Sequence, residues 1–168
     1  ILAEAETARA GGKGRIVAKM NSLLDPEVIN ALYEASQAGV TVDLIVRGVC
    51  ALRPGVAGLS ENIRVRSIIG RFLEHHRIFY FYAGGKENVY LSSADWMERN
   101  FFKRIELAFP ILDPKLKKRV ITEGLKFYMA DNQQGWDMNC VGVYQRRRSA
   151  RAKPHNAQGE LMITLGGG

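Results

Sequence analysis

Hydrophobic runs and helical spacing alternate along the first part of the chain. The runs at 15–20 (RIVAKM) and 40–46 (VTVDLIV) have the length and composition of buried strands. Between them, Asp25-Pro26-Glu27 is a typical helix start, with a capping carboxylate followed by a proline at the first helical position. Residues 29–36 keep helical spacing until Gly39 ends the helix. A strand, a helix and a strand within about thirty residues predict a βαβ unit with parallel strands.

In the middle of the chain, side chains alternate in character with the period of two that is typical of strands. Residues 62–68 (NIRVRSI) alternate between uncharged side chains on one face and two arginines on the other, after a turn-rich loop at 51–60. The β-rich runs at 77–82 and 88–93 are joined by AGGKE, which predicts a hairpin.

The two ends of the chain complete the pattern. Residues 1–10 suit a helix, and 103–111 alternate like a strand. Pro114 begins a helix that reaches about Tyr128, and 141–145 predict a last short strand. The fold class predicted is therefore α/β, with one mixed, mostly parallel sheet flanked by helices.

The net charge indicates which class of partner the protein binds. The chain has 24 Lys and Arg against 17 Asp and Glu, a formal charge of +7, which favours a polyanion such as nucleic acid, a membrane surface or a phosphate polymer. Five of the basic residues but only one acid lie in 146–168. We therefore expect a domain at 1–145 and a basic tail at 146–168, whose stretch NAQGELMITL predicts a short docked helix.

Several classes of protein are excluded by what the sequence lacks. No apolar run approaches the roughly 18 residues of a membrane span, and the first residues do not form a signal peptide. Cys50 and Cys140 stand far apart with no CxxC, which excludes a disulfide scaffold and favours the reducing cytosol. The chain does not begin with Met, so we expect it to be a piece of a longer protein.

The first candidate site is VRGVCALRPG at 46–55. Arg47 ends a predicted strand, where α/β sheets place ligands, and Gly48 after it leaves room for a phosphate to approach the backbone. Arg47 and Arg53 offer forked donors that fit phosphate oxygens. The alternative is a strand-end arginine that merely reaches water.

The second candidate is FLEHHRIFYF at 72–81. Adjacent side chains on a strand point to opposite faces, so His75 and His76 cannot both face one site. A histidine in a phosphate cleft could serve as acid, base or hydrogen-bond donor. The alternative is one exposed and one packed histidine. His75 and Arg77 resemble the HxK pattern of phospholipase D-like enzymes, with Arg in place of Lys.

The third candidate is LSSADWMERN at 91–100. Ser93-Ala94-Asp95 stands where the phospholipase D-like pattern has Ser-x-Asn, so these groups could hold a phosphate or the histidine. They could equally cap a helix that begins at Trp96. The basic tail is a fourth candidate, because it would bind any polyanion, although it could also be only a solvated extension.

Together these segments resemble the C-terminal region of bacterial polyphosphate kinases. The stretch AKMNSLLDPEV…IVRG…FLEHHRIFYF, then LSSADWMERN, FPILDP and DNQQGWD, follows the order of that family over about residues 10–145. The resemblance implies a phospholipase D-like fold and the last domain of a longer enzyme. Its active site would lie in a tunnel between the two C-terminal domains.

The family's motifs carry over to two residues. The arginine of the IVRG motif, which contacts ATP phosphates, falls on Arg47, and the essential histidine of the LEH motif falls on His75. His76 is then a neighbour at a variable position. RNFFKRIEL departs from the family's RNLDRRVE, with Phe102 in place of Asp, so any role of that turn is in doubt.

The resemblance implies an ATP:polyphosphate phosphotransferase. The γ-phosphate would move reversibly through a phosphohistidine on a preceding domain, and Mg²⁺ would accompany ATP with ligands mainly outside this chain. Expected partners are ATP, ADP, polyphosphate, the remaining domains and further copies in a homo-oligomer, with no specific nucleic acid. Cytoplasmic location is expected, with contact to the inner membrane left open. Further phosphate-lining candidates, from charge and pattern, are Arg53, Arg64, Arg66 and Ser93.

Two other functions stay open from the residues. A phospholipase D-like phosphodiesterase or nuclease needs two histidine motifs, and this chain has one; it would cleave phosphodiesters by itself. A non-catalytic polyanion-binding module would bind polyanions with a steep salt dependence. Its binding would vanish on deleting 146–153 and would not change in Arg47→Ala. If the chain is a domain of a polyphosphate kinase, we expect residues 1–168 alone to be inactive.

Overall fold

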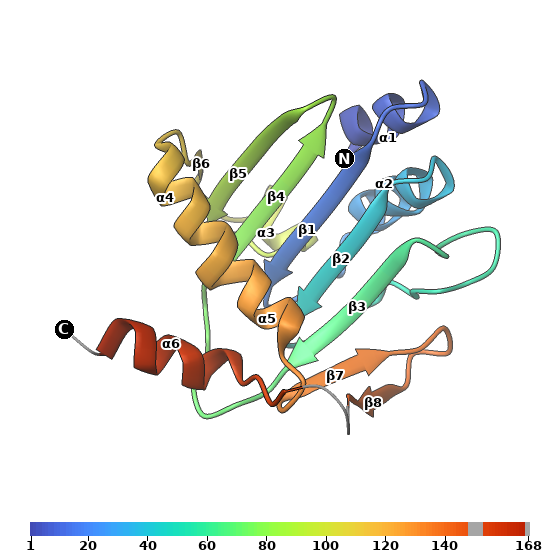
Figure 1. Cartoon of the computed structure of the whole chain (residues 1–168). Helices are drawn as coiled ribbons and strands as arrows, with labels where there is room; N and C mark the ends of the chain where they lie inside the picture. Colours follow the sequence, from blue (N-terminus) through green and yellow to red (C-terminus); the bar gives the residue numbers. More distant parts are fainter. Residues whose placement is uncertain (148–152, 167–168) are drawn as a thin grey trace.

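The computed structural model describes residues 1–147 and 153–166, and within them a single open sheet of eight strands forms the centre of the molecule (Figure 1). The strand order across the sheet is β6-β5-β4-β1-β2-β3-β7-β8. The strands are β1 (Gly14–Met20), β2 (Thr41–Val46), β3 (Ile63–Ile68), β4 (Arg77–Ala83), β5 (Lys86–Ser92), β6 (Ala108–Pro110), β7 (Gly135–Met138) and β8 (Tyr144–Arg146).

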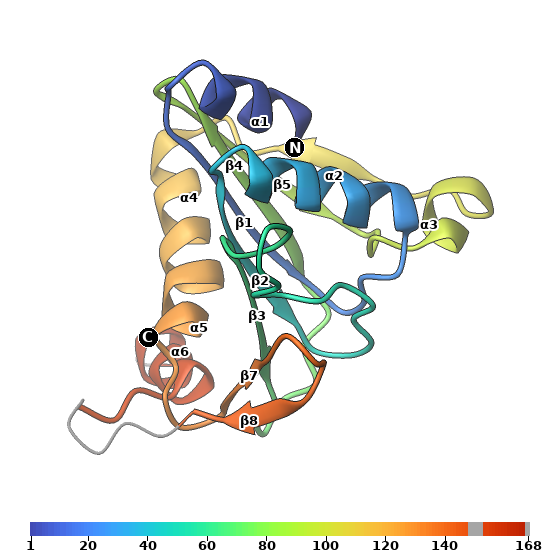
Figure 2. The same cartoon turned by 90° about the vertical axis from the view of Figure 1, so that its right-hand side faces the viewer.

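Helices cover both faces of the sheet, as Figure 2 shows. On one side lie α1 (Leu2–Arg9), α2 (Pro26–Gln37) and α3 (Glu98–Phe102). On the other lie α4 (Pro114–Arg119), the π-helical segment η1 (Val120–Lys126), α5 (Phe127–Ala130) and α6 (Ala157–Gly166). None of the helices in the described ranges is long and apolar enough to cross a membrane.

The mixed sheet flanked by helices was predicted correctly, but the expectation of mostly parallel strands was wrong. Only β1 with β2 and β2 with β3 pair in parallel, and the other five neighbouring pairs in the described sheet are antiparallel. The α2 crossover and the long loop after β2 each return the chain to the same end of the sheet. The strands on either side of this parallel centre are added in antiparallel orientation, by hairpins and by other connections that reverse the chain direction.

In the first half of the chain, caps and turns predicted from neighbouring residues form as expected. The side chain of Asp25 accepts a hydrogen bond from the backbone N–H of Val28 at 3.0 Å, as expected of a helix cap. Gly39 ends α2 with φ of +94°, and the loop at 51–60 contains no strand. The predicted hairpin forms between β4 and β5, and its turn contains Gly84 and Gly85 at positive φ.

The strand predicted at 103–111 is confined to Ala108–Pro110. The side chain of Glu106 accepts hydrogen bonds from Ser93 and Asn100, and the N–H of Leu107 bonds to the Ser93 hydroxyl at 3.0 Å. These contacts fix the segment before β6 in an irregular path, so only three of its alternating residues pair with β5.

The C-terminal part contains one strand that the sequence analysis did not predict. That strand, β7, pairs antiparallel with β3, and the predicted strand at 141–145 forms as β8 at Tyr144–Arg146. The docked helix predicted after the basic run is present as α6. Arg148 and Arg151 of that run lie outside the described residues, and the domain boundary at residue 145 stays a prediction.

Two hydrophobic cores lie on the two faces of the sheet. The larger packs under α1 and α2, and its members include Ile16, Leu32, Val42, Val65 and Phe79. The smaller packs under the α4–α5 helix and includes Val17, Ile45, Ile78, Leu125 and Tyr128. Successive residues of β1 therefore enter different cores, which makes it a strand buried on both faces.

We predict that Gly124→Ala destabilises the fold although alanine favours helices. A Cβ at Gly124 would overlap the Cδ1 atom of Ile78, which is buried in the smaller core. Overpacking of this kind costs about 1–3 kcal/mol, more than the roughly 1 kcal/mol of helix propensity gained.

The control is the same change in an Ile78→Val background, where the overlapping methyl group is absent. There Gly124→Ala should become neutral or stabilising in urea denaturation. An equal loss of stability in both backgrounds would contradict this packing argument.

Candidate active site

Arg47 lies at the edge of the sheet where β1 and β2 end. Its backbone N–H bonds to the carbonyl of Met20 at 3.3 Å, and its guanidinium donates through Nη2 to the side-chain oxygen of Asn21. Its Nε atom is buried without a hydrogen-bond partner in the described residues. Arg47 therefore keeps a donor that no described protein group uses, at a point where the backbone of Gly48 is exposed.

Asp95 organises this edge from the turn after β5. It is 3% exposed and accepts hydrogen bonds from the backbone N–H groups of Asn21 and Ser22, at 2.7 and 3.2 Å. It also forms a two-pronged ion pair with Arg77, whose Nε and Nη2 lie 3.2 and 3.1 Å from its two oxygens. Arg77 in turn donates to the backbone carbonyl of His75 at 2.5 Å.

One continuous series of hydrogen bonds thus connects the two residues carried over from the family motifs. It runs through Arg47, Asn21, Asp95, Arg77 and the backbone of His75. The His75 side chain is exposed and makes no hydrogen bond to a described residue. Its backbone is held while its imidazole stays accessible, as a group that meets a ligand must be.

His76 lies just before β4, and its ring contacts a different set of residues from the one that holds the His75 backbone. Its Nε2 lies 2.6 Å from the ammonium of Lys19 in β1, and its ring packs edge-on against Tyr128, with centroids 5.8 Å apart. The Lys19 ammonium also sits 3.1 Å above the Tyr128 ring and forms an ion pair with Glu74. His76 is therefore part of a polar cluster with Lys19, Glu74 and Tyr128, although its own side chain stays partly exposed.

Glu74 is the centre of this cluster. Besides Lys19, it accepts hydrogen bonds from the hydroxyl of Tyr128 at 2.6 Å and the amide of Gln158 at 2.9 Å. Gln158 comes from α6, and its side chain also exchanges two 2.9 Å hydrogen bonds with the backbone of Phe72. The segment that leads into His75 is thereby anchored from β1, from α5 and from α6.

Burial governs the protonation of the cluster. Burial lowers the pKa of Lys19 to about 8 although Glu74 opposes the shift, and the nearby positive charge of Arg47 adds to it. Burial, with the charge of Lys19, lowers the pKa of His76 to about 4. Burial would raise the pKa of Glu74, but Lys19, Tyr128 and Gln158 outweigh it and lower that pKa. His76 is consequently neutral near pH 7.

The other predicted phosphate-lining residues lie elsewhere. Arg53 packs against Gly142 in the turn between β7 and β8, and Ser93 is committed to Glu106 and Leu107. Arg64 and Arg66 emerge from β3 on the face of the sheet that carries the α4–α5 helix, and Arg66 pairs with Asp137 at 2.8 Å. None of the four forms a hydrogen bond with Arg47 or His75 in the described chain.

The sequence analysis missed two residues of this region. Asn21 links Arg47 to the Asp95 turn, and Lys19 anchors Glu74. A signal for Lys19 was present, because a lone lysine inside the apolar run RIVAKM must have a partner if that run is a buried strand. The role of Asn21 depends on a contact with Asp95, 74 positions away, that no local pattern shows.

No group of three or more His, Cys, Asp or Glu residues in the described chain is arranged to hold a metal ion. Arg47 and His75 also line none of the five cavities that we compared along the described surface.

The arrangement of strands and helices is that of the phospholipase D-like fold. A phospholipase D family member, Nuc from Salmonella typhimurium, superposes with a TM-score of 0.55 over 80% of this chain and 88% of its own, at 19% identity, a likeness of fold alone. Within that fold, the chain belongs to the polyphosphate kinase C-terminal domain 2 family, whose model matches residues 1–158.

Relatives and a solved structure agree with this assignment. The polyphosphate kinase of Paraburkholderia phytofirmans is 68% identical over 96% of this chain, and that of Burkholderia cenocepacia is 69% identical over 90%. The crystal structure of polyphosphate kinase from Porphyromonas gingivalis superposes with a TM-score of 0.93 over 99% of this chain, at 42% identity. The chain spans 22 to 25% of the length of these relatives.

We predict that His76 titrates well below the usual range of a histidine. His76 should titrate near pH 4 because of burial and the charge of Lys19. Lys19→Met should raise the pKa of His76, since it removes a positive charge and leaves Glu74 beside the ring. The measurement is a pH titration of the imidazole nitrogens by NMR.

The control is Lys13→Met, which removes an exposed cation ahead of β1 and should leave the pKa of His76 unchanged. A pKa of His76 near 6.5 in the folded wild type would refute the described cluster.

Proposed function

We propose that this chain forms one wall of the active site of an ATP:polyphosphate phosphotransferase. Its membership of the polyphosphate kinase C-terminal domain 2 family supports this role. The observation that carries the proposal is the hydrogen-bonded edge that joins Arg47 to the backbone of His75. The reaction proposed moves the γ-phosphate of ATP reversibly to a growing polyphosphate chain, through a phosphohistidine on another part of the enzyme.

Arg47 would bind the phosphate oxygens of ATP. The other arginine of this edge, Arg77, has its charge balanced by Asp95, whereas the guanidinium of Arg47 donates to the neutral side chain of Asn21 and forms no described ion pair. Its buried Nε donor has no described partner, and a phosphate oxygen would satisfy it. A guanidinium offers paired donors that match phosphate geometry, so Arg47 can both bind the nucleotide and stabilise charge during transfer.

His75 would act on the transferred group from the same edge. Its exposed imidazole can donate a hydrogen bond to the phosphoryl group, or hold the proton that moves as a phosphohistidine forms and breaks. The anchors of Glu74 and Arg77 on either side fix where the ring is presented. His76, although its side chain is 40% exposed, is neutral and its Nε2 is occupied by the ammonium of Lys19.

The residues of this edge do not fit a magnesium site. Its carboxylate, Asp95, is occupied by Arg77 and by two backbone N–H groups, and the nearby free groups are cationic. Mg²⁺ prefers oxygen ligands and commonly enters with nucleotide phosphates. We propose that Mg²⁺ arrives with ATP, and that its protein ligands lie outside this chain.

The remaining partners follow from the proposed reaction. They are ATP or ADP, polyphosphate, the rest of the parent enzyme and further copies of it in a homo-oligomer. Cytoplasmic location stays a prediction from the sequence, and no described feature indicates contact with a membrane.

We predict that His75→Ala and His76→Ala have very different activities in a whole polyphosphate kinase that contains this chain. His75→Ala should lower ATP-dependent polyphosphate synthesis by about 10²–10⁴-fold, the contribution of a general acid or base. His76→Ala should retain activity within about threefold, because the Nε2 of that ring is already occupied by Lys19. Arg47→Ala should raise the KM for ATP by about 10–100-fold, the effect of losing a charge-assisted hydrogen bond.

Circular dichroism and thermal unfolding of each variant would exclude misfolding as the cause. If a folded His75→Ala enzyme is fully active, the catalytic assignment is wrong. Phosphodiester cleavage by the 168-residue chain itself would instead favour the phospholipase D-like hydrolase.

A further inference from the structure

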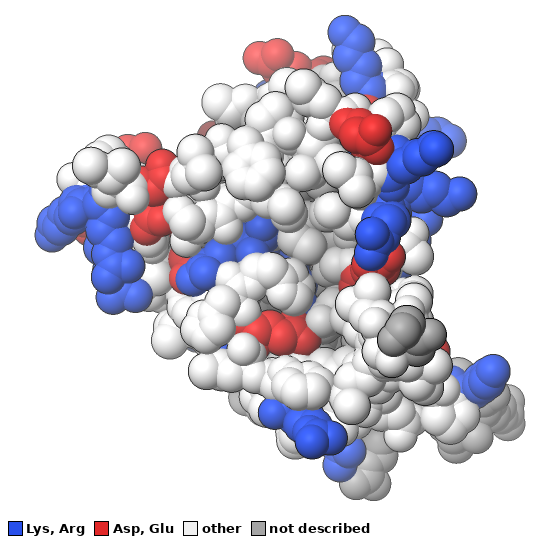
Figure 3. All heavy atoms as spheres, turned by 90° about the vertical axis from the view of Figure 1, so that its left-hand side faces the viewer, with Lys and Arg blue, Asp and Glu red and all other residues white. Residues whose placement is uncertain are grey.

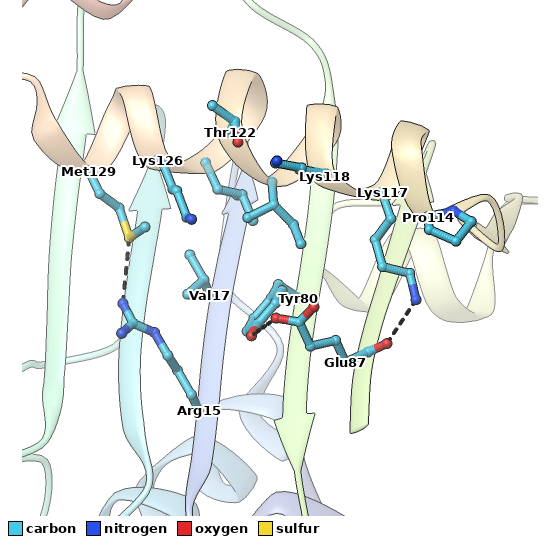
Figure 4. Close-up of a pocket in the computed structure, with 12 residues that line it drawn as sticks. Arg15, Val17, Tyr80, Glu87, Pro114, Lys117, Lys118, Thr122, Lys126 and Met129 are labelled. Atoms are coloured by element: carbon cyan, nitrogen blue, oxygen red, sulfur yellow. Dashed lines mark hydrogen bonds between the residues drawn. The ribbon is translucent and has the colours of Figure 1, made fainter. Parts of the chain in front are cut away.

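A basic groove lies on the sheet face that carries the α4–α5 helix. Figure 4 shows its main cavity, of about 590 Å³, between that helix and strands β1, β4 and β5. Lys126 points from the helix into the space above Val17, and Arg15 rises from β1 toward Met129. Seen from the β6 edge, Lys and Arg side chains also gather over α4, at the right of Figure 3.

This cavity continues across the sheet. A second cavity of about 220 Å³ shares Arg15 and Met129 with the first. A third, of about 320 Å³, shares Arg64, Arg66 and Arg147 with the second. The three cavities adjoin one another through these shared residues, from β5 to β7. We call them together the basic groove, and its cations are Arg15, Arg64, Arg66, Lys117, Lys118, Lys126 and Arg147.

The groove has more cations than its carboxylates can balance. Seven cations face three acids, and each acid is already occupied: Asp43 by Arg15, Asp137 by Arg66, and Glu87 by the hydroxyl of Tyr80. The other five cations form no ion pair with a described carboxylate. Three of these, Arg64, Lys118 and Lys126, are exposed. A line of unbalanced cations along an open groove fits an extended anion.

The groove is separate from the candidate active site. On β1, Arg15 and Lys19 lie on the same face four residues apart, which corresponds to about 13 Å along a strand. Between them, Val17 packs with Ile45, Leu125 and Tyr128 in the smaller core. This apolar layer divides the groove from the Lys19 cluster, so a polymer could occupy the groove only as a second point of contact.

We propose that the basic groove binds a stretch of the polyphosphate chain away from its reacting end. This inference rests on the proposed function, because that function makes polyphosphate the polyanion present at the enzyme. Proteins that bind single-stranded nucleic acid stack bases on aromatic rings. The described lining of the groove offers one aromatic side chain, Tyr80, whose hydroxyl is bound to Glu87. A polymer of phosphates needs only cations at intervals.

The first test measures binding of fluorescently labelled polyphosphate to the 168-residue chain. The groove variant is Arg64→Gln, Lys118→Gln and Lys126→Gln, and its matched control is Arg99→Gln, Lys103→Gln and Arg104→Gln, which removes three exposed charges near α3. The groove variant should lose at least about tenfold in affinity and its log–log salt slope should fall by about three, one for each lost contact. The control should change affinity by less than about threefold.

Two outcomes would contradict the proposal that the basic groove binds polyphosphate. Equal losses in both variants would mean attraction by net charge alone. Competition by single-stranded DNA as effective as by unlabelled polyphosphate, at equal phosphate concentration, would assign the groove to nucleic acid instead.

A second test separates the groove from the proposed function. In the whole kinase, the groove variant should raise the KM for long polyphosphate at least about tenfold, while the KM for ATP stays unchanged. An unchanged KM for long polyphosphate, with loss of activity in His75→Ala, would reject the groove and keep the proposed function. A wild-type kinase that makes no polyphosphate would reject the proposed function, whereas binding to the chain alone would still report on the groove.

Discussion

The ion pair between Lys19 and Glu74 is the interaction on which much of this structure depends. Lys19 lies in a strand that is buried on both faces, and an unpaired ammonium there would cost several kcal/mol. Its partner comes from the segment before β4, and that partner is completed by Tyr128 and Gln158. The need to satisfy one buried charge therefore brings four separate parts of the chain together beside His75.

A second buried charge does the same on the other side of that histidine. Asp95 would be equally costly without partners, and it finds them in two backbone N–H groups at the end of β1 and in Arg77. The two charged clusters lie on opposite faces of β4, and His75 stands between their attachment points at Glu74 and Arg77. Rigidity is thus concentrated in the backbone around His75, while its imidazole is left exposed.

The sequence predicted those features that local residues determine. The cap at Asp25, the alternation of 62–68 and the hairpin at Gly84-Gly85 depend on neighbours along the chain, and all three form. Arg47 and His75 were proposed from motifs of a known family, and a series of hydrogen bonds connects Arg47 to the backbone of His75.

What the sequence did not show depends on distant contacts. The antiparallel pairing of β7 with β3 joins residues about 70 positions apart, since Arg66 pairs with Asp137, so the balance between parallel and antiparallel strands was misjudged. The irregular path before β6 is fixed by the side-chain bonds of Glu106 rather than by its alternating pattern. Arg64 and Arg66 were recognised as phosphate-binding candidates, but their separation from Arg47 follows from the apolar layer around Val17.

The two hydrogen bonds between Gln158 and the backbone of Phe72 have a consequence for synthesis on the ribosome. They join positions 86 residues apart, and the N-terminus of α6 is itself held by Asp131 through the N–H of Ala157. Protein domains begin to fold while they are still being translated. The sheet can assemble early, but the segment before His75 acquires its last anchor only after residue 158 has left the ribosome. A nascent chain halted shortly before that point would carry every catalytic side chain proposed here on an incompletely fastened support.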